Sequence, residues 1–357
     1  MTSTSAHFPA DPPADSPADS RRDLLAAWLG SHAERYSLDL ATLAPASSDA
    51  SFRRYFRLAS AGTDGATLIA VDAPPPEKCR EFAQVAQLLE AASVHVPRVL
   101  EADFDVGFML VTDLGTAPYL QTLQEAGPGP RSRELTRDAL DALIRWQSSS
   151  REGVLPVFDE AFMQREMELM PEWFLERHLG RKVDEATRGV LDRTFALLVA
   201  SARAQPQTFM LRDFMPRNLM IATPNPGVLD FQDAVYGPIT YDVVSLLRDA
   251  FLTWDEEFEL DCFAHYWERA KKAGLPVDAD FGEFYRQLEW MGLQRHIKVL
   301  GLFCRINYRD GKPHYMADLP RFLGYAIKVA HRYRPLVPFA RLIDELQGSA
   351  VEVAYTF

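Results

Sequence analysis

The sequence predicts an α+β chain of two lobes, a small sheet-rich N-terminal lobe followed by a larger helical lobe. The chain has 357 residues, enough for two compact parts, and 47% of them are hydrophobic, as a globular core requires. Short apolar or alternating runs dominate the part before residue 114, whereas helical periodicity dominates the part after it. We therefore expect a disordered, Pro/Ala/Ser/Asp-rich tail at 1–20, a nucleotide-binding lobe at 21–114 and a helical catalytic and substrate-binding lobe at 115–357.

The elements of the N-terminal lobe follow from its periodicity. The segment 21–36 is amphipathic and predicts a helix, because its apolar residues fall on one side. Runs of β-branched and aromatic residues bounded by turn residues predict strands. In chain order, the elements expected after the first helix are strands at 51–58 and 67–71, a helix at 77–92, and strands at 99–104 and 108–112.

Beyond residue 115 the pattern is mostly helical. The helices expected are 133–147, 160–178, 184–203, 241–252, 256–273, 281–308 and 320–333. Between the third and the fourth of these, two short apolar runs flank the turn TPNPG at 223–227, which predicts a hairpin.

Composition excludes several classes of protein. The formal net charge of -12, with no dense basic run, argues against a nucleic-acid partner. No apolar run reaches membrane-spanning length, and the N-terminus lacks the basic start and apolar stretch of a signal peptide. The three cysteines are too far apart in sequence for a disulfide framework or a metal cluster, so we expect buried thiols. These features predict a soluble, cytoplasmic protein, and we expect a monomer.

The hairpin carries the chemistry. Residues 211–220 read LRDFMPRNLM, with Asp213 five residues before Asn218, and VLDFQD at 228–233 places Asp230 twelve residues after Asn218. The hairpin is expected to bring Asn218 and Asp230 together. Phosphoryl transfer from ATP needs such a set: one carboxylate orients a hydroxyl and accepts its proton, while an amide oxygen and a second carboxylate hold magnesium.

The order of these residues resembles the catalytic and metal loops of the protein-kinase-like superfamily. From about residue 21 onward the chain is similar to the aminoglycoside phosphotransferase and choline kinase branch, whose loop usually reads His-Gly-Asp-x-x-x-x-Asn. Leu211 and Arg212 stand here at the first two positions. The resemblance implies a two-lobed protein-kinase-like fold, ATP and Mg²⁺ as cofactors, Asp213 as catalytic base, and Asn218 and Asp230 as metal ligands.

Five further segments carry a second, narrower resemblance: DASFRRYF at 49–56, VDAPP at 71–75, HVPRVL at 95–100, PEWFL at 171–175 and QRHIKVLG at 294–301. They are similar to segments of the bacterial N-acetylmuramate/N-acetylglucosamine kinases. That family phosphorylates the anomeric hydroxyl of its sugar with ATP during recycling of cell-wall sugars, so the resemblance implies this activity and a small amino-sugar substrate. Asp242 matches a downstream Asp of the broader branch, for which we expect a structural role.

The N-terminal lobe departs from the usual kinase pattern. It has no G-x-G-x-x-G, so small residues at 47–51 are expected to cover the phosphates, and the strand at 67–71 has no lysine to pair with them. Nearby basic residues are the candidates to replace that lysine, although a solvated surface position is their alternative. The nucleotide contacts that we predict come from Ser51, Arg53, Arg54, Lys78 and Asp113.

Substrate contacts are predicted from residues that offer charge or an aromatic ring. Trp173 offers a ring for stacking, and Arg295 and Lys298, three residues apart on one helix, offer positive charge to the lactyl carboxylate of muramic acid. The alternatives are core packing for Trp173 and pairing with surface acids for the two cations. Arg165 and Glu166 offer polar groups to the sugar, with a solvated helix face as their alternative.

Two classes of function remain open from the residues alone. The first is a small-molecule kinase for an amino sugar, within which an aminoglycoside, choline or another sugar is the alternative acceptor. The second is a nucleotide-binding scaffold without catalysis, suggested by the missing lysine and glycine-rich loop. The complete set of Asp213, Asn218 and Asp230 favours the kinase, because a scaffold has no need of a base.

Overall fold

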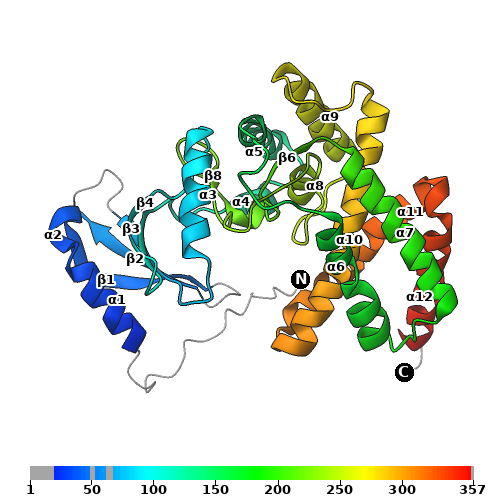
Figure 1. Cartoon of the computed structure of the whole chain (residues 1–357), viewed down its shortest axis with the longest axis horizontal. Coiled ribbons are helices and arrows are strands. Elements are labelled where there is room, and N and C mark those ends of the chain that lie inside the picture. Colours follow the sequence, from blue (N-terminus) through cyan, green and yellow to red (C-terminus); the bar gives the residue numbers. More distant parts are fainter. Residues whose placement is uncertain (1–19, 49–52, 62–66, 355–357) are drawn as a thin grey trace, which may run out of the picture. The chain divides into compact units, whose positions relative to one another are not determined.

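The computed structural model describes residues 20–48, 53–61 and 67–354, which form two compact units (Figure 1). The first unit comprises the described residues of Met1–Arg80 together with Arg98–Asp113. The second comprises Glu81–Pro97 and the described residues of Leu114–Phe357. Most of helix α3 (Cys79–Ala91) therefore belongs to the second unit, whereas the sequence analysis assigned the whole of 21–114 to one lobe.

The first unit is built on a five-stranded antiparallel sheet in the order β1-β2-β3-β5-β4. Leu25 and Leu29 of α1 pack with buried residues of β1, β2, β3 and β5, so this helix covers one face of the sheet (Figure 1). The elements are α1 (Ser20–Gly30), α2 (Ala33–Tyr36), β1 (Leu38–Ser48), β2 (Arg54–Ser60), β3 (Thr67–Asp72), β4 (Val99–Asp103) and β5 (Phe108–Thr112).

Parts of the prediction for the first unit were wrong. Strand β1 was not expected, because Pro45 and two shifts in its register with β2 obscure the alternation of side chains. The helix predicted at 21–36 is interrupted after Gly30 and resumes at Ala33. In the loop predicted to cover the phosphates, residues 47 and 48 belong to β1, and Ser51 lies outside the described residues.

The long helix α10 (Phe281–Asp310) lies at the centre of the second unit and packs against α6, η1, α7, α8, α9 and α11. Gly301 permits a close approach of α10 to the backbone between α6 and η1, because a Cβ at this position would lie 2.1 Å from the backbone carbon of Leu169. No other residue fits there without moving the backbone. The contact presses the junction of α6 and η1 against α10, which places Glu166 of α6 beside this helix.

Two short pairs of antiparallel strands, β6 with β9 and β7 with β8, complete the second unit. Its helices are α4 (Tyr119–Ala126), α5 (Pro130–Ser148), α6 (Glu160–Met167), the π-helix η1 (Met170–His178), α7 (Glu185–Ala204), α8 (Tyr241–Leu247), α9 (Glu256–Lys272), α11 (Leu319–Arg332) and α12 (Val337–Ala354). Its strands are β6 (Gln207–Met210), β7 (Leu219–Met220), β8 (Gly227–Val228) and β9 (Val235–Pro238), and its 3-10 turns are η2 (Pro216–Asn218), η3 (Pro313–Asp318) and η4 (Arg334–Leu336).

Three predictions for the second unit were wrong in detail. The single helix expected at 160–178 is two helices, α6 and η1, and Pro171 near the start of η1 removes a backbone donor there. The helix expected at 241–252 ends at Leu247. Helices α4 and α12 and strands β6 and β9 were not expected, since α4, β6 and β9 are short and α12 contains the weak helix formers Pro338 and Gly348.

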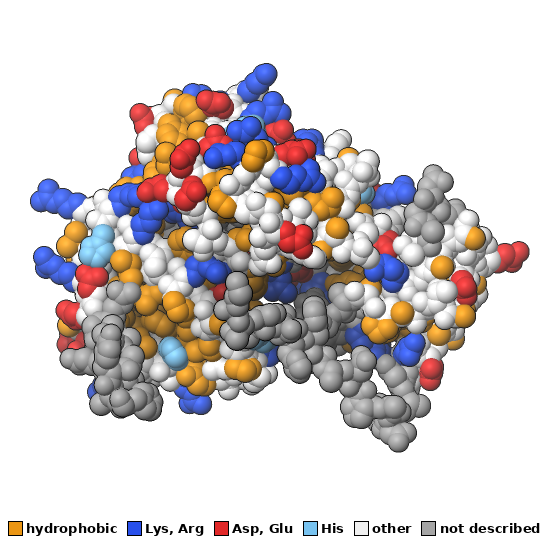
Figure 2. Space-filling view, turned by 180° about the vertical axis from the view of Figure 1, so that it is seen from behind, with side chains coloured by type: hydrophobic (Ala, Val, Ile, Leu, Met, Phe, Trp, Pro, Cys, Tyr) orange, Lys and Arg blue, Asp and Glu red, His pale blue; other side chains and the backbone are white. Residues whose placement is uncertain are grey.

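The fold class itself, a sheet-rich unit and a mainly helical unit, is confirmed. The three cysteines Cys79, Cys262 and Cys304 are buried thiols, as expected, and none of them is part of a disulfide bond. Within the described ranges, no helix is both long and apolar enough to cross a membrane. Figure 2 shows acidic and basic side chains intermixed over the visible face, in keeping with the lack of a dense basic run in the sequence.

Candidate active site

The sequence from β6 to β9 folds into the predicted hairpin. Leu219 and Met220 of β7 pair with Val228 and Gly227 of β8, and the backbone N–H of Leu229 donates to the carbonyl of Asn218 at 2.9 Å. The turn between the strands is fixed from outside, because Asn225 donates to the Asp138 carboxylate of α5 at 2.7 Å. The hairpin is therefore anchored at both ends and holds its polar side chains in fixed relative positions.

Asp213 lies partly exposed at the start of this loop. Its backbone carbonyl accepts the side-chain N–H of Asn218 at 2.9 Å and the backbone N–H of Met215 at 3.0 Å. Its carboxylate makes no hydrogen bond or ion pair with another described residue. The backbone of Asp213 is thus fixed while its carboxylate remains open to a hydroxyl group of a substrate.

Asn218 and Asp230 lie side by side, as predicted. Nδ2 of Asn218 is 3.3 Å from Oδ2 of Asp230, and Nε2 of Gln232 donates to Oδ1 of Asp230 at 2.8 Å. The amide nitrogen of Asn218 makes the contacts with Asp213 and Asp230. Its amide oxygen accepts no hydrogen bond from the described residues and can therefore bind a cation. The pair offers hard oxygen ligands, which suit Mg²⁺.

The number of protein ligands also fits magnesium bound with a nucleotide. In the part of the chain that the structure describes, no three His, Cys, Asp or Glu side chains gather into a metal cage. Magnesium in phosphotransfer sites is usually held by one or two protein groups together with phosphate oxygens and water. Asn218 and Asp230 match that pattern better than they match a structural metal site.

Two residues of the loop have left-handed backbone conformations that non-glycine residues rarely adopt. Arg212 has φ of 73° and Asp230 has φ of 57°. Such residues cost roughly 1–3 kcal/mol each and cluster at functional sites. The strain at Arg212 is offset by Asp242, whose carboxylate accepts the backbone N–H of Leu211 at 2.6 Å and that of Arg212 at 2.9 Å.

Asp242 is fully buried, and this burial raises the pKa of its carboxyl group to about 7. The two backbone N–H donors and the charge of Arg295 oppose the rise, whereas the nearby charge of Asp213 adds to it. The structural role expected for Asp242 is therefore specific: it clamps the turn that presents Asp213.

A buried cluster of charges lies behind the loop. Glu166 of α6 accepts from Arg212 at 2.8 Å, contacts Nζ of Lys298 at 2.9 Å, and lies 3.4 Å from the amide of Gln294. Burial alone would raise the pKa of Glu166, but the charges and hydrogen bonds of Lys298 and Arg212 outweigh it and lower the pKa. The cluster joins the loop to α6 and α10 through one carboxylate.

The structure therefore brings two of the five predicted substrate residues, Glu166 and Lys298, to the back of the catalytic loop. Arg295 is also buried on α10, with Nη1 lacking a protein partner, and its charge acts on Asp242. Trp173 of η1 is half-buried against the hydrophobic core of the second unit. Arg165 is exposed on α6 and lies over the ring of Phe162.

The predicted nucleotide residues lie in the first unit. Arg53 pairs with Glu77 at 3.0 Å, and Arg54 donates to the buried carboxylate of Asp72, which Arg21 also holds. Lys78 is exposed. Asp113 accepts from Arg57 and from the hydroxyl of Thr67. Asp72 therefore stands at the end of β3, near where kinases place a lysine, and two arginines neutralise it. Phosphate contact by Arg53, Arg54 or Lys78 stays a prediction.

Sequence reasoning missed two residues that shape the site. Gln232 orients Asp230, and its position two residues after that acid in the same short segment was the available signal. Arg212 was noted only as a departure from the usual glycine, yet its guanidinium links the loop to Glu166. Its role depends on α6, which is far from it in sequence.

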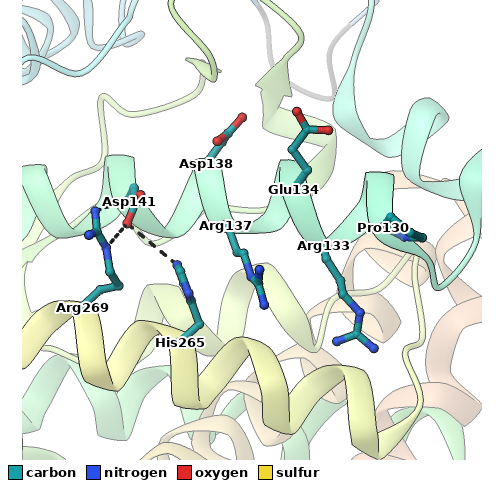
Figure 3. A pocket seen from close by; sticks show the side chains of 8 residues that line it. All are labelled: Pro130, Arg133, Glu134, Arg137, Asp138, Asp141, His265 and Arg269. Carbon is teal, nitrogen blue, oxygen red and sulfur yellow. Dashed lines mark hydrogen bonds and ion pairs between the residues drawn. The ribbon is translucent and has the colours of Figure 1, made fainter.

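A hollow that holds none of these residues lies between α5 and α9 (Figure 3). Its volume is about 620 Å³. Arg137 pairs with Asp261 at 3.1 Å, and Asp141 lies between Arg269 and His265. No predicted site residue lines it, and its arginines already face carboxylates. We therefore assign this groove no part in catalysis. Its lining residues are Pro130, Arg133, Glu134, Arg137, Asp138, Asp141, His265 and Arg269.

Comparison with known proteins now adds to this geometry. Residues 42–276 match the model of the phosphotransferase enzyme family, described by the abbreviation APH. The chain belongs to this family. The match contains the whole Asp213, Asn218 and Asp230 loop, so the resemblance expected from that loop is confirmed.

Curated relatives share much of the sequence. A protein of Neisseria meningitidis named N-acetylmuramate/N-acetylglucosamine kinase is 44% identical over 339 residues, which cover 94% of this chain and 99% of the relative. A protein of the same name from Pseudomonas aeruginosa is 49% identical over 311 residues, which cover 87% of this chain and 90% of the relative. The narrower resemblance noted in the sequence is therefore also confirmed.

Solved structures of the same fold are more distant in sequence. The ADP-bound aminoglycoside phosphotransferase APH(2'')-Ib has a TM-score of 0.56 and 13% identity, covering 85% of this chain and 98% of its own. A choline/ethanolamine kinase family protein from Mesorhizobium loti has a TM-score of 0.58 and 14% identity, covering 91% of this chain and 98% of its own. These similarities confirm the protein-kinase-like fold.

Proposed function

We propose that the protein is an ATP-dependent kinase that phosphorylates the anomeric hydroxyl of N-acetylmuramate and N-acetylglucosamine, in the cytoplasm, during recycling of cell-wall sugars. The observation that supports the proposal most is the 44% identity to a kinase of that name over 94% of the chain. The open carboxylate of Asp213 and the adjacent side chains of Asn218 and Asp230, each of which has an oxygen ligand to offer, supply the groups that such a kinase needs.

Asp213 is proposed as the base. The anomeric oxygen loses its proton toward Asp213 as its bond to the γ-phosphorus forms, and the bond from phosphorus to the bridging oxygen of ADP breaks. The anomeric hydroxyl belongs to a hemiacetal and is more acidic than an ordinary alcohol, so a single carboxylate suffices to accept its proton. The clamp from Asp242 keeps the backbone of Asp213 in place during this step.

Asn218 and Asp230 are proposed as the ligands of Mg²⁺. A magnesium ion held by these two residues would neutralise the negative charge that develops on the phosphates. Gln232 holds one oxygen of Asp230, which leaves the other directed toward Asn218 and the cation. The proposal thus assigns Gln232 to orienting a metal ligand.

The test is to incubate the protein with ATP, magnesium and each sugar, and to locate the phosphate by phosphorus–proton NMR coupling. Coupling to H1 of either sugar supports the proposal. The Asp213→Asn variant, purified in parallel, controls for kinases carried over from the expression host. Phosphate on the 6-oxygen, or no reaction with either sugar while an aminoglycoside or choline is turned over, contradicts it.

A further inference from the structure

A second hollow, of about 400 Å³, opens beside the catalytic loop within the second unit. It is lined by α4, by the turn η2, by the segment after α8 and by η3. Arg217 of η2 is the one Lys, Arg, Asp or Glu among its described lining residues. Phe251 and Tyr315 give the hollow aromatic walls, and Gln121 and Gln124 give it amide groups.

Arg217 differs from Arg212 and Lys298 because no carboxylate pairs with it in the described part of the chain. It is exposed, and its guanidinium lies over the ring of Phe251 with Cζ 5.0 Å from the ring centre. Stacking of this kind fixes the plane of a guanidinium and leaves its N–H edge to bind an anion. Arg212 and Lys298, by contrast, are already held by Glu166.

One acid lies close to Arg217 without bonding to it. Asp249, after α8, is 1% exposed, and neither carboxylate oxygen has a partner in normal hydrogen-bond geometry. Burial raises the pKa of this carboxyl group, and the rise is opposed by the charge of Arg295, by the backbone N–H groups of Ala250 and Phe251 and, least, by the charge of Arg217. Because Asp249 is enclosed and makes no bond to Arg217, the outer edge of the guanidinium stays open to the hollow.

The position of Arg217 couples the hollow to the chemistry. Arg217 immediately precedes Asn218 and lies four residues after Asp213 in the same turn, which the bond from the N–H of Asn218 to the carbonyl of Met215 closes at 2.9 Å. A ligand bound by this guanidinium is therefore bound by the same turn that carries the base and one of the metal ligands. A planar donor fork with an aromatic wall suits a sugar that carries a carboxylate.

We infer that Arg217 selects the acidic substrate by binding the lactyl carboxylate of N-acetylmuramate, with the sugar ring against the aromatic wall of the hollow. The inference rests on the proposed function and adds to it a reason for discrimination. N-acetylglucosamine has the same acetamido group and anomeric hydroxyl but lacks the carboxylate on carbon 3. The two sugars therefore differ in the one group that Arg217 recognises.

The test compares the two sugars in Arg217→Gln. A hydrogen bond to a charged group contributes about 10- to 100-fold to binding, so kcat/KM for N-acetylmuramate should fall by about that factor. For N-acetylglucosamine it should stay within about twofold. Arg217→Glu should lower the N-acetylmuramate value further, because it places two carboxylates together, and Arg217→Lys should retain part of the preference, since it keeps charge but not the planar fork.

Arg177→Gln is the matched control. Arg177 is also exposed and also lies over a ring, that of Tyr308 at 5.7 Å, but it does not line the hollow. Its variant should treat both sugars as the parent does. Equal losses for the two sugars in Arg217→Gln, or a rise in the KM for ATP alone, would assign Arg217 to the loop or the nucleotide and overturn the inference, as would no change at all.

Binding measured by calorimetry keeps this test separate from the proposed function. If the parent transfers phosphate to neither sugar, the proposed function fails. The inference still stands if the parent binds N-acetylmuramate more tightly than N-acetylglucosamine and Arg217→Gln removes the difference. It fails if the parent binds the two sugars equally, or binds neither.

Discussion

Two of the clusters of charged side chains in the second unit each join one carboxylate to two cations, yet they serve different ends. Behind the catalytic loop, Glu166 is 7% exposed and holds Arg212 and Lys298. At the contact between α5 and α9, Asp261 of α9 holds Arg133 and Arg137 of α5, and the side chains of all three are at least 33% exposed. Only the first cluster includes a residue of the catalytic loop.

The difference in burial decides how much each cluster matters. A buried carboxylate between two cations leaves uncompensated charges if it is removed, whereas an exposed ion pair returns to water at little cost. The buried cluster therefore fixes the position of Arg212 next to Asp213. The exposed ion pairs between α5 and α9 contribute little to stability. The groove between these helices is nevertheless larger than the hollow beside the catalytic loop, about 620 Å³ against about 400 Å³, so the size of a hollow is a poor guide to the active site.

The largest effect is expected for Asp213, the proposed base of the catalytic loop. Asp213→Asn should lower kcat by about 10²–10⁴-fold, because general-base help is typically of that size. ATP affinity should stay near that of the parent. Asp141→Asn in the groove is the matched control and should leave turnover unchanged. Steady-state kinetics with either sugar measures both, and turnover of Asp213→Asn within twofold of the parent would exclude the base assignment.

The next largest effect is expected for Asp230, a proposed ligand of the magnesium ion. Asp230→Ala should remove magnesium-dependent nucleotide binding, since it deletes the carboxylate of the proposed site. Gln232→Leu should weaken the same binding by a smaller factor, about 10- to 100-fold, as expected when a group that orients a ligand is lost. Titration of ATP with and without magnesium measures both. Unchanged magnesium dependence in Asp230→Ala would show that the metal binds elsewhere.

Breaking the buried cluster tests the comparison directly. Glu166→Gln leaves Arg212 and Lys298 buried without an anion, so the free energy of unfolding should fall by about 3–5 kcal/mol. Urea unfolding monitored by tryptophan fluorescence measures this change. A loss below 1 kcal/mol would mean that water reaches the cluster, and that its burial does not set it apart from the groove.

Asp242 predicts a dependence of stability on pH. Its pKa of about 7 in the folded protein lies above the value of about 3.9 in an unfolded chain. Between these values the folded protein holds a proton that the unfolded chain has lost, so this group's contribution to stability falls as pH rises from about 4 to about 7 and is constant above that. Burial is the main cause of the raised folded pKa; the N–H groups of Leu211 and Arg212 oppose it, and of the charged residues that face Asp242, Asp213 adds to the rise and Arg295 opposes it.

The measurement is the free energy of unfolding of the parent relative to Asp242→Asn across this range. The parent should lose stability relative to the variant as pH rises, because only the parent comes to bury a charge. The opposite trend would mean that the N–H donors of Leu211 and Arg212 outweigh burial and hold the folded pKa below that of the unfolded chain.

The smallest effect is expected in the groove. Asp261→Asn should lower the free energy of unfolding by about 0.2–1 kcal/mol, as for other exposed ion pairs, and 1 M salt should remove most of the difference. Catalysis should be unaffected. A loss of several kcal/mol, or a change in KM for a sugar, would contradict the view that the groove is only a surface contact between α5 and α9.

Some elements of each unit could be predicted from the sequence and others could not, for a physical reason. The strand pattern of β2, β3, β4 and β5 was predicted because their side chains alternate or are continuously apolar, and period is a local property. Strand β1 was missed because shifts in its register with β2 break the alternation. The break between α6 and η1 was missed because the apolar pattern continues across it.

The predicted site shows the same division. The pairing of Asn218 with Asp230 was predictable, since both residues flank one short turn. The partners of Glu166 and Lys298 were not, because these residues lie 132 positions apart in a 357-residue chain and meet only through the packing of α6 on α10. Gly301, whose missing side chain permits that packing, carries no signal of it in the sequence.

The chemistry could be predicted from the residues alone. The types, order and spacing of Asp213, Asn218 and Asp230, together with the resemblance to a family of kinases, were sufficient for this. Tertiary structure decided which charges are available. Arg54 is bound to Asp72, Lys298 is bound to Glu166, and Arg217 lies over Phe251 with no carboxylate partner among the described residues. Spacing along a chain fixes local geometry, but whether a cation is neutralised depends on which distant carboxylate the fold places beside it.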